Sequence, residues 1–285
     1  MNDELLEELL KVEEDLARKR IRLVLGGGMS LYLRHRYLRR DPERRYPIQI
    51  ESRSTNDLDF YFTADLIVNR QAAEGVKECL SRLGYSLLAK NFQFVKEVQT
   101  QGGPRTFKVD LLAQPPKEGD SPLVDVKPPR IKPKGARGIH AYLTEEAEGI
   151  DIGIVEVDLK PLSDGKVYLP SSFNYLIMKL HAFNDRKDRE DEKSDRGRHH
   201  ALDIFVTVSR MNAEDWEIAR KHLARDRSRP YLKEAAEIRK ACFSRPTDVG
   251  LTRLRENELY RRDRETLDNY LQPFIEDLSA LFPEE

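Results

Sequence analysis

The chain has 285 residues, of which 39% are hydrophobic and 35% are charged. This length allows one large domain or two modest ones with real cores, and it excludes a small disulfide scaffold. The 49 basic and 50 acidic residues leave a formal net charge of -1, which excludes a protein that coats nucleic acid by bulk charge.

Cysteine usage and hydropathy bear on the cellular compartment. Cys79 and Cys242 lie far apart and outside any CxxC or Cys/His spacing, so the sequence predicts neither a disulfide framework nor a zinc site. The first residues are acidic with a helical pattern, and no stretch reaches the apolar length of a membrane span. We therefore expect a cytoplasmic protein without a signal peptide or membrane anchor.

The first elements form a helix, a strand, a glycine turn and a second helix. Apolar residues recur at helical spacing from Leu5 to Val12 and predict an amphipathic helix that ends near Arg20. Residues 21–25 are apolar and β-branched, and they stop at a run of three glycines. A helical pattern resumes over 29–38. We predict a strand, a glycine turn and a helix in that order.

The next segment predicts strands on both sides of one helix. Asp57–Phe62 alternates polar and apolar residues, which predicts a strand with Asp57 and Asp59 on one face. A helix over 66–83 follows. Residues 92–98 and 107–112 are predicted as paired strands around a glycine and proline turn, with Asp110 in the second strand.

The rest of the chain changes from strands to helices. Prolines and lysines in 114–137 predict that part of this segment is an extended excursion along the surface. Residues 139–143, 152–159 and 167–169 are further strand candidates. Helical patterns begin at 173–183 and continue to the end. The predicted fold class is α/β (α+β), with a mixed β-sheet and flanking helices over residues 1–170 and a helical domain over 171–285.

The glycine turn is a candidate phosphate site. Gly27 and Gly28 stand between a strand and a helix, where backbone N–H groups and the positive helix end face an anion, and Ser30 adds a hydroxyl donor. The turn matches neither the dinucleotide fingerprint nor the Walker pattern. A plain structural turn is the alternative interpretation.

Three aspartates are candidate metal ligands. Asp57 and Asp59 place two carboxylates on one strand face, where their repulsion favours a bound divalent cation. Asp110 is flanked by apolar residues and needs compensation for its charge. If the two strands are neighbours, the three carboxylates converge and suffice for two Mg²⁺ ions that also take phosphate oxygens. An ordinary solvated strand face is the alternative for the Asp57–Asp59 pair alone.

These motifs, in this order, resemble the nucleotidyltransferase superfamily with the DNA polymerase beta-like fold. The segments GGGMSLYL and RSTNDLDFYF are most similar to the AbiEii-type branch, the toxins of abortive-infection toxin-antitoxin systems. That branch also carries a lysine on a later helix and an aspartate some residues beyond it, and Lys179 and Asp203 match these positions. The resemblance spans roughly residues 20–210.

The resemblance implies a reaction and a role for each residue. The catalytic set would be Asp57, Asp59, Asp110, Lys179 and Asp203, with the first three holding two Mg²⁺ ions so that an acceptor hydroxyl attacks the α-phosphorus of a nucleoside triphosphate (NTP). Nucleotide binding would fall to Gly27, Gly28, Ser30, Arg53 and Lys179. Lys179 would neutralise triphosphate charge, and Asp203 would orient Lys179 or the acceptor.

Structural interpretations stand beside these roles. Lys179 lies on an otherwise apolar helix face and fits a surface lysine that covers apolar area with its stem. Asp203 fits a helix cap or a salt bridge to a neighbouring helix. The arginines between Arg34 and Arg53 fit a solvated face, with a nucleic-acid contact as the alternative.

The sequence therefore supports three hypotheses of function. The first is a Mg²⁺-dependent nucleotidyltransferase in the domain over 1–170, acting on RNA such as tRNA, with a cognate antitoxin as a partner. The second is a nucleotidyltransferase that modifies a small molecule such as an aminoglycoside, or a protein. The third is a non-catalytic NTP-binding or partner-binding module of the same fold.

Overall fold

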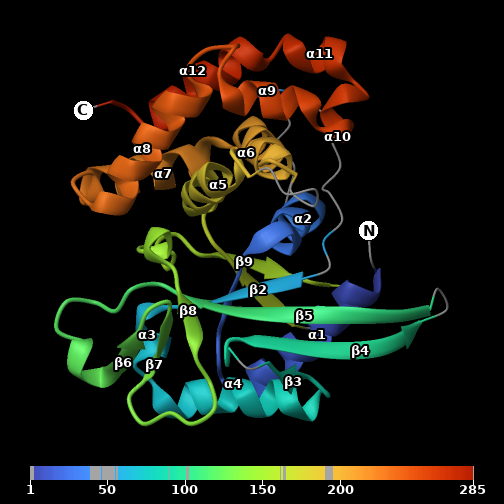
Figure 1. The fold of residues 1–285 in the computed structure, drawn as a ribbon, viewed down its shortest axis with the longest axis vertical. Helices are drawn as coiled ribbons and strands as arrows, with labels where there is room; N and C mark the ends of the chain where they lie inside the picture. The colour runs from blue at the N-terminus through green and yellow to red at the C-terminus, as the bar shows by residue number, and fades with distance from the viewer. Residues whose placement is uncertain are drawn as a thin grey trace. The chain divides into compact units, whose positions relative to one another are not determined.

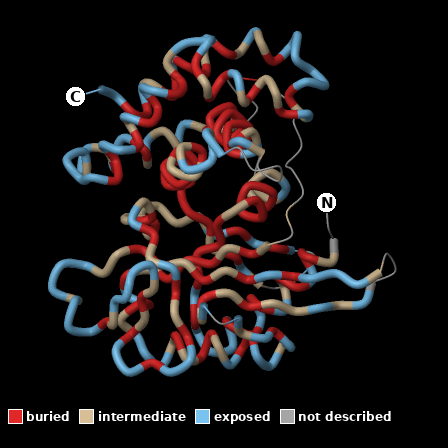
Figure 2. Tube along the Cα trace, viewed as in Figure 1, coloured by how far each residue is buried: buried red, intermediate tan, exposed pale blue. Residues whose placement is uncertain are grey.

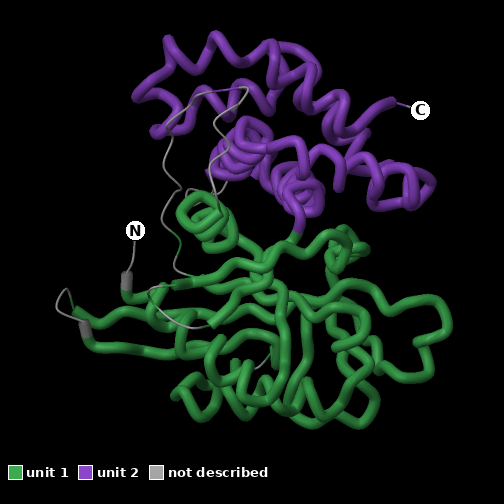
Figure 3. The backbone as a smooth tube through the Cα atoms, turned by 180° about the vertical axis from the view of Figure 1, so that it is seen from behind, with its two compact units in different colours: residues 1–39, 52–170 green, residues 40–51, 171–285 purple. Residues whose placement is uncertain are grey.

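The computed structural model describes residues 3–38, 46, 55, 57–88, 90–100, 103–160, 162, 165–189 and 195–284. The chain divides into two compact units, with residues 1–39 and 52–170 in unit 1 and residues 40–51 and 171–285 in unit 2 (Figure 3). Unit 1 contains a mixed β-sheet with flanking helices, and unit 2 is helical. The predicted fold class is confirmed.

Unit 1 contains four α-helices and ten strands within the described residues. The helices are α1 (Asp3–Arg18), α2 (Gly27–Tyr37), α3 (Ala64–Ile67) and α4 (Arg70–Arg82). The strands are β1 (Val24–Leu25), β2 (Asp57–Phe62), β3 (Ser86–Leu87), β4 (Gln93–Thr100), β5 (Gly103–Ala113), β6 (Val124–Lys127), β7 (Arg130–Pro133), β8 (Ala141–Leu143), β9 (Val155–Asp158) and β10 (Lys166–Leu169). Two short 3-10 helices, at Ser121–Leu123 and Glu145–Ala147, lie between strands.

The ten strands form one sheet in the order β6-β7-β8-β5-β2-β1-β10-β9, with β4 paired to both β3 and β5 (Figure 1). At its centre β2 runs parallel to β5 and antiparallel to β1. The long strands β4 and β5 form the predicted antiparallel pair. The predicted strand over Asp57–Phe62 is also confirmed, and it lies directly beside the strand that carries Asp110.

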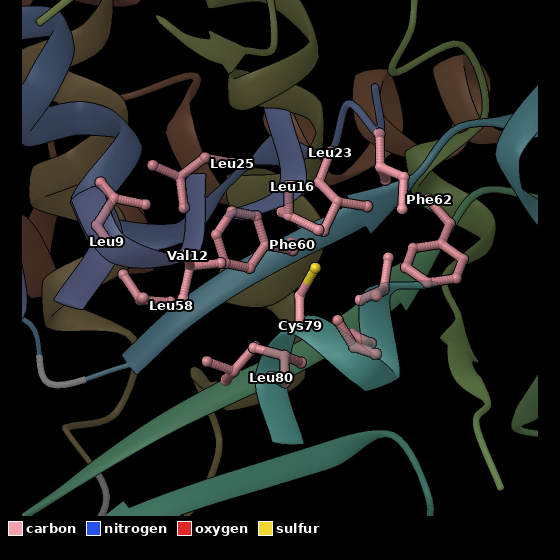
Figure 4. Close-up of a cluster of buried hydrophobic side chains, with 14 of the residues drawn as sticks. Leu9, Val12, Leu16, Leu23, Leu25, Leu58, Phe60, Phe62, Cys79 and Leu80 are labelled. Carbon is pink, nitrogen blue, oxygen red and sulfur yellow. The ribbon is translucent and has the colours of Figure 1, made fainter. Parts of the chain in front are cut away.

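The core of unit 1 packs helices α1 and α4 against one face of the sheet (Figure 4). Alternation along β2 turns Leu58 and Phe60 toward this core, because successive strand residues point to opposite faces. Leu9, Val12 and Leu16 of α1 meet them. Each such side chain contributes about 1.5–3 kcal/mol when buried. Along β2, Leu58, Phe60 and Phe62 are buried, and the opposite face carries polar side chains. Figure 2 shows that buried residues are concentrated in the interior of unit 1.

One sequence prediction in unit 1 is wrong, and another is incomplete. The predicted helix over 66–83 is two helices, because Asn69 caps α4 by accepting a hydrogen bond from the Ala72 backbone N–H at 3.0 Å. Within the segment 114–137, part of which is predicted to be extended along the surface, β6 and β7 form an antiparallel hairpin that the sequence did not predict. Its prolines lie before β6, in the turn and at the end of β7, so neither strand is interrupted.

Unit 2 is built around its first two helices, most of whose residues are buried. Buried phenylalanines of the first two helices, Phe173, Phe183 and Phe205, lie in its core. Tyr46 also belongs to this unit, where its ring lies 5.5 Å from that of Tyr270 and its hydroxyl donates to Asp277. The helices of unit 2 are α5 (Ser172–Arg186), α6 (Arg198–Arg210), α7 (Ala213–Asp226), α8 (Pro230–Phe243), α9 (Val249–Glu256), α10 (Glu258–Arg261), α11 (Arg264–Asp268) and α12 (Leu271–Leu281).

Neither unit contains a membrane-spanning element in the part of the chain that the structure describes, since none of its helices has the length and apolar character to cross a bilayer. Both cysteines are buried free thiols, Cys79 in α4 and Cys242 in α8.

Candidate active site

The three predicted carboxylates lie on one face of the sheet in unit 1. The parallel register of β2 and β5 pairs Asp59 with Asp110 and Asp57 with Lys108. Residues paired across neighbouring strands share a face, as do residues two apart on one strand. All three aspartates are half-buried, on the face opposite the Leu58 and Phe60 core. The register thus places three like charges together, with one lysine beside them.

The surroundings of Asp110 shift the pKa of its carboxyl and leave one of its oxygens without a hydrogen bond from the described part of the chain. Burial raises the pKa of its carboxyl, the charge of Asp57 raises it further, and a hydrogen bond from the Gln93 side chain acts in the opposite direction. Gln93 lies directly opposite Asp110 in the β4–β5 register. The Oδ1 atom of Asp110 is buried and has no hydrogen-bond partner among the described residues. Such an oxygen carries an unmet desolvation cost, which a cation or a donor would relieve.

The glycine turn packs directly against the second aspartate. The Gly26 backbone N–H donates to the Asp59 backbone carbonyl at 2.7 Å, and Gly27 has a φ of +62°. A Cβ atom at Gly27 would lie 1.9 Å from Asp59 Oδ2. At Gly28 a Cβ atom would lie 3.0 Å from Thr55 Cβ. Only glycine at position 27 permits both the left-handed backbone conformation and this close approach to a carboxylate.

Helix α2 begins at this turn, which brings its positive end to the aspartate face. Gly27 and Gly28 are its first residues, and Ser30 follows within the first turn. Ser30 is fully buried, and its hydroxyl has no hydrogen-bond partner among the residues that the structure describes. N–H groups of a helix start and an uncommitted hydroxyl are the features that bind phosphate oxygens. The glycine turn that is predicted to bind phosphate therefore adjoins Asp59, one of the predicted metal ligands.

Two residues at this site were missed by sequence reasoning. Tyr61 follows Asp57 and Asp59 on the same face, and a Cβ atom at Gly26 would lie 2.5 Å from its ring. Burial, with the nearby charges of Asp59 and Glu146, raises the pKa of Tyr61 well above its ordinary value. The alternation along β2 could have identified Tyr61. Gln93 could not be found in this way, because its place opposite Asp110 depends on the register of β4 and β5.

The aspartate face fits Mg²⁺ that is bound together with substrate phosphates. Among the described residues, no three His, Cys, Asp or Glu side chains converge into a group that could hold a metal ion by themselves. Mg²⁺ does not require such a cage, because it keeps several waters and binds through one or two carboxylates plus substrate phosphates. The unpartnered Asp110 Oδ1 and the glycine approach to Asp59 Oδ2 fit this mode of binding.

The remaining predicted site residues lie in unit 2, apart from Arg53, which is outside the described residues. The ammonium of Lys179 on α5 lies 2.7 Å from Asp203 Oδ2 on α6, and the two side chains are only 8% and 2% exposed. Lys179 also lies 5.0 Å from the centre of the Tyr175 ring. Burial contradicts the interpretation of Lys179 as a surface lysine. Asp203 forms the predicted salt bridge to a neighbouring helix and is not a cap.

Comparisons with known proteins give only distant similarities. No family model matches the chain, and no curated protein matches it. Its structure is similar to the antibiotic-resistance factor ANT(2'')-Ia, with 12% identity, 80% of this chain and 95% of that chain covered, and a TM-score of 0.41. It is also similar to an antigenic nucleotidyltransferase-like protein from Paracoccidioides brasiliensis, with 15% identity, 99% and 98% covered, and a TM-score of 0.46.

Proposed function

We propose that the protein is a Mg²⁺-dependent nucleotidyltransferase that moves a nucleoside monophosphate from an NTP to an acceptor hydroxyl. One observation carries the proposal: Asp59 and Asp110 lie side by side on parallel strands, with Gly27 at the start of α2 in contact with Asp59. Carboxylates and a helix start at one place combine the partners of a metal ion with those of a phosphate group.

In the proposed reaction the acceptor oxygen forms a bond to the α-phosphorus. The bond from that phosphorus to the pyrophosphate oxygen breaks, pyrophosphate leaves, and the hydroxyl proton is released. Mg²⁺ would neutralise charge on the phosphates and make the acceptor hydroxyl more acidic. Asp57, Asp59 and Asp110 would hold the two ions. Because little covalent chemistry falls to the protein, positioning and charge stabilisation account for most of the catalysis.

The first turn of α2 would bind the triphosphate. Backbone N–H groups at the start of α2 and the Ser30 hydroxyl would donate hydrogen bonds to the phosphate oxygens. Arg53 would add a positive charge to the phosphates. These donors hold the leaving pyrophosphate and do not take part in bond making, so their loss should weaken NTP binding more than it alters the choice of acceptor.

Lys179 and Asp203 enter the proposal through the sequence resemblance to the AbiEii-type proteins. Lys179 would neutralise triphosphate charge, and the 2.7 Å ion pair supports a role for Asp203 in holding Lys179 in place. The same resemblance supports RNA, such as tRNA, as the acceptor and a cognate antitoxin as a protein partner.

The test is transfer of label from α-labelled ATP, CTP, GTP and UTP, each with Mg²⁺, into total cellular RNA. Wild type is compared with the double variant Asp57→Asn, Asp59→Asn. The matched control is Asp65→Asn, Asp158→Asn, which makes the same charge change at exposed positions of unit 1. We expect a discrete labelled RNA with wild type and the control, and a loss of about 100-fold or more with the site variant. Equal labelling by both variants would refute the proposal.

A further inference from the structure

The aspartate face continues across three more strands to an edge of the sheet. Leu112, two residues after Asp110 on β5, pairs with Tyr142 on β8. Tyr142 pairs with Arg130 on β7, and Arg130 pairs with Lys127 on β6. Paired residues share a face, so Tyr142, Arg130 and Lys127 follow one another outward on the face that carries Asp110. At about 4.8 Å per strand, β6 lies about 14 Å from β5.

This outer part of the face has a strong positive charge within a chain that is nearly neutral overall. Between Val124 and His140 the sequence carries five basic residues and one acidic residue, Asp125. The Asp125 carboxylate lies 3.6 Å from the Lys132 ammonium. Lys127, Arg130 and Lys134 make no ion pair with any residue in the described part of the chain. Their charges are therefore available to an anionic partner.

The same surface offers an aromatic ring and a cavity. Tyr142 is 39% exposed, and its ring is fixed edge-on against Phe92 with the ring centres 5.5 Å apart. A cavity of about 470 Å³ is lined by Val124, Asp125, Val126, Lys127, Lys132 and His140. The Nδ1 atom of His140 has no hydrogen-bond partner among the described residues. Burial, followed by the charges of Lys132 and Arg130, lowers the pKa of His140, which keeps its ring neutral near pH 7.

We propose that this outer face, defined by Tyr142, Arg130, Lys132 and Lys127, binds the phosphodiester backbone of the single-stranded RNA whose hydroxyl is the acceptor. The inference rests on the proposed function, because the row of residues starts at Asp110. Cations spaced along a strand suit successive phosphates, and an exposed, fixed aromatic ring suits base stacking. A single strand is favoured because its bases are free to stack on a protein ring, as those of a duplex are not.

The experiment measures binding of a short fluorescein-labelled single-stranded RNA to the full chain by anisotropy over a series of salt concentrations, without NTP. Lys127→Ala, Arg130→Ala is compared with wild type. The control is Arg220→Ala, Lys221→Ala, which removes two exposed positive charges from α7. We expect the first variant to weaken binding at least about tenfold at low salt and to lower the slope of log K against log salt by about 1.4, as for two lost phosphate contacts. The control should bind as wild type does.

A second comparison tests the aromatic ring. Tyr142→Phe should retain binding, whereas Tyr142→Ala should weaken it about fivefold or more, since one stacked base is lost. Wild type that fails to bind RNA, or equal binding by the two double variants, would overturn the inference. RNA binding that depends on Lys127 and Arg130 supports the inference even if no nucleotide is transferred. The failure of the proposed function can therefore be distinguished from the failure of this inference. If the Lys127→Ala, Arg130→Ala variant transfers nucleotide at the same RNA concentrations as wild type, this inference alone is overturned.

Discussion

The two units differ in how their buried carboxylates are paired. In unit 2 the carboxylate of Asp203 is almost fully buried and is neutralised at 2.7 Å by Lys179 of a neighbouring helix. In unit 1 Asp57, Asp59 and Asp110 share one half-buried face, and Asp110 Oδ1 has no hydrogen-bond partner among the described residues. Asp203 is therefore compensated within the protein, whereas Asp110 keeps one buried oxygen that a bound cation or donor could satisfy.

A further buried acid, Glu13, avoids an unpaired charge in a different way. Glu13 of α1 is 5% exposed, and burial raises the pKa of its carboxyl to about 8. This side chain is therefore protonated at pH 7 and carries no charge. A buried acid can thus be paired, be protonated or be left for a ligand. Only the last state is useful to a cation-dependent enzyme, and this contrast supports the assignment of the active site to unit 1.

The largest expected effect comes from breaking the compensated pair. Lys179→Met leaves the Asp203 carboxylate buried without its cation, and we expect it to lower the free energy of unfolding by about 3–5 kcal/mol. Urea denaturation measures the loss. Asp203→Leu in the same chain should recover most of it, because no uncompensated charge remains. Lys221→Met, at an exposed ion pair, is the control, and an equal loss in that variant would contradict the comparison.

Because Glu13 is buried and protonated, the free energy of unfolding should depend on pH. The folded-state pKa of Glu13 lies above the unfolded value of 4.5, so its contribution to stability is complete below pH 4.5 and is lost as the pH rises toward 8. Glu13→Gln should therefore stabilise the protein by on the order of 3 kcal/mol at pH 7 and by much less at pH 4.5.

Chemical denaturation at both pH values measures this difference. Glu14→Gln alters the adjacent, exposed residue and should show no comparable pH dependence. A stabilisation by Glu13→Gln that is the same at both pH values would show that burial does not raise the pKa of Glu13.

The third prediction concerns a steric clash introduced on the aspartate face. Gly27→Ala places a methyl group where Asp59 Oδ2 lies, and the resulting displacement should lower the rate of transfer on the order of 100-fold. Gly119→Ala is the control, since Gly119 also has a positive φ, of +92°, but has open space around its Cβ position. If both variants lose activity equally, backbone strain and not contact with Asp59 explains the effect.

The smallest expected effect concerns the orientation of Asp110. Gln93→Leu removes the side-chain hydrogen bond to this carboxylate, which is worth about 0.5–1.5 kcal/mol. We expect a several-fold lower rate of transfer and a higher Mg²⁺ concentration at half-maximal activity, with little change in melting temperature. Gln99→Leu, farther along β4 on the same face and exposed, should behave as wild type.

The strands and the glycine turn of the site could be predicted from the sequence, but the register between the strands could not. Alternation in Asp57–Phe62 predicts which aspartates share a face, and the glycine run predicts the turn before α2. The pairing of Asp59 with Asp110 depends on hydrogen bonds between β2 and β5, which no local pattern specifies. Burial of Lys179 was equally hidden, because its partner Asp203 lies on another helix.

The missed hairpin has a different cause. Prolines over 114–137 suggested an irregular segment, but they lie at the ends of β6 and β7 and in their turn. Composition over a window cannot show where each proline falls relative to a strand. The position of the hairpin's basic residues on the aspartate face follows from the register of β5, β8, β7 and β6, which the sequence does not show.

Under the proposed function, Mg²⁺ and nucleotide bind at the aspartate face of unit 1 and offset its negative charge. Calorimetric titration of a non-hydrolysable NTP with Mg²⁺ tests it most directly, in wild type, Asp59→Asn and the control Asp158→Asn. The account predicts Mg²⁺-dependent binding to wild type and the control and its loss in Asp59→Asn, with all three proteins folded. Binding to Asp59→Asn with wild-type affinity and the same dependence on Mg²⁺ would contradict it.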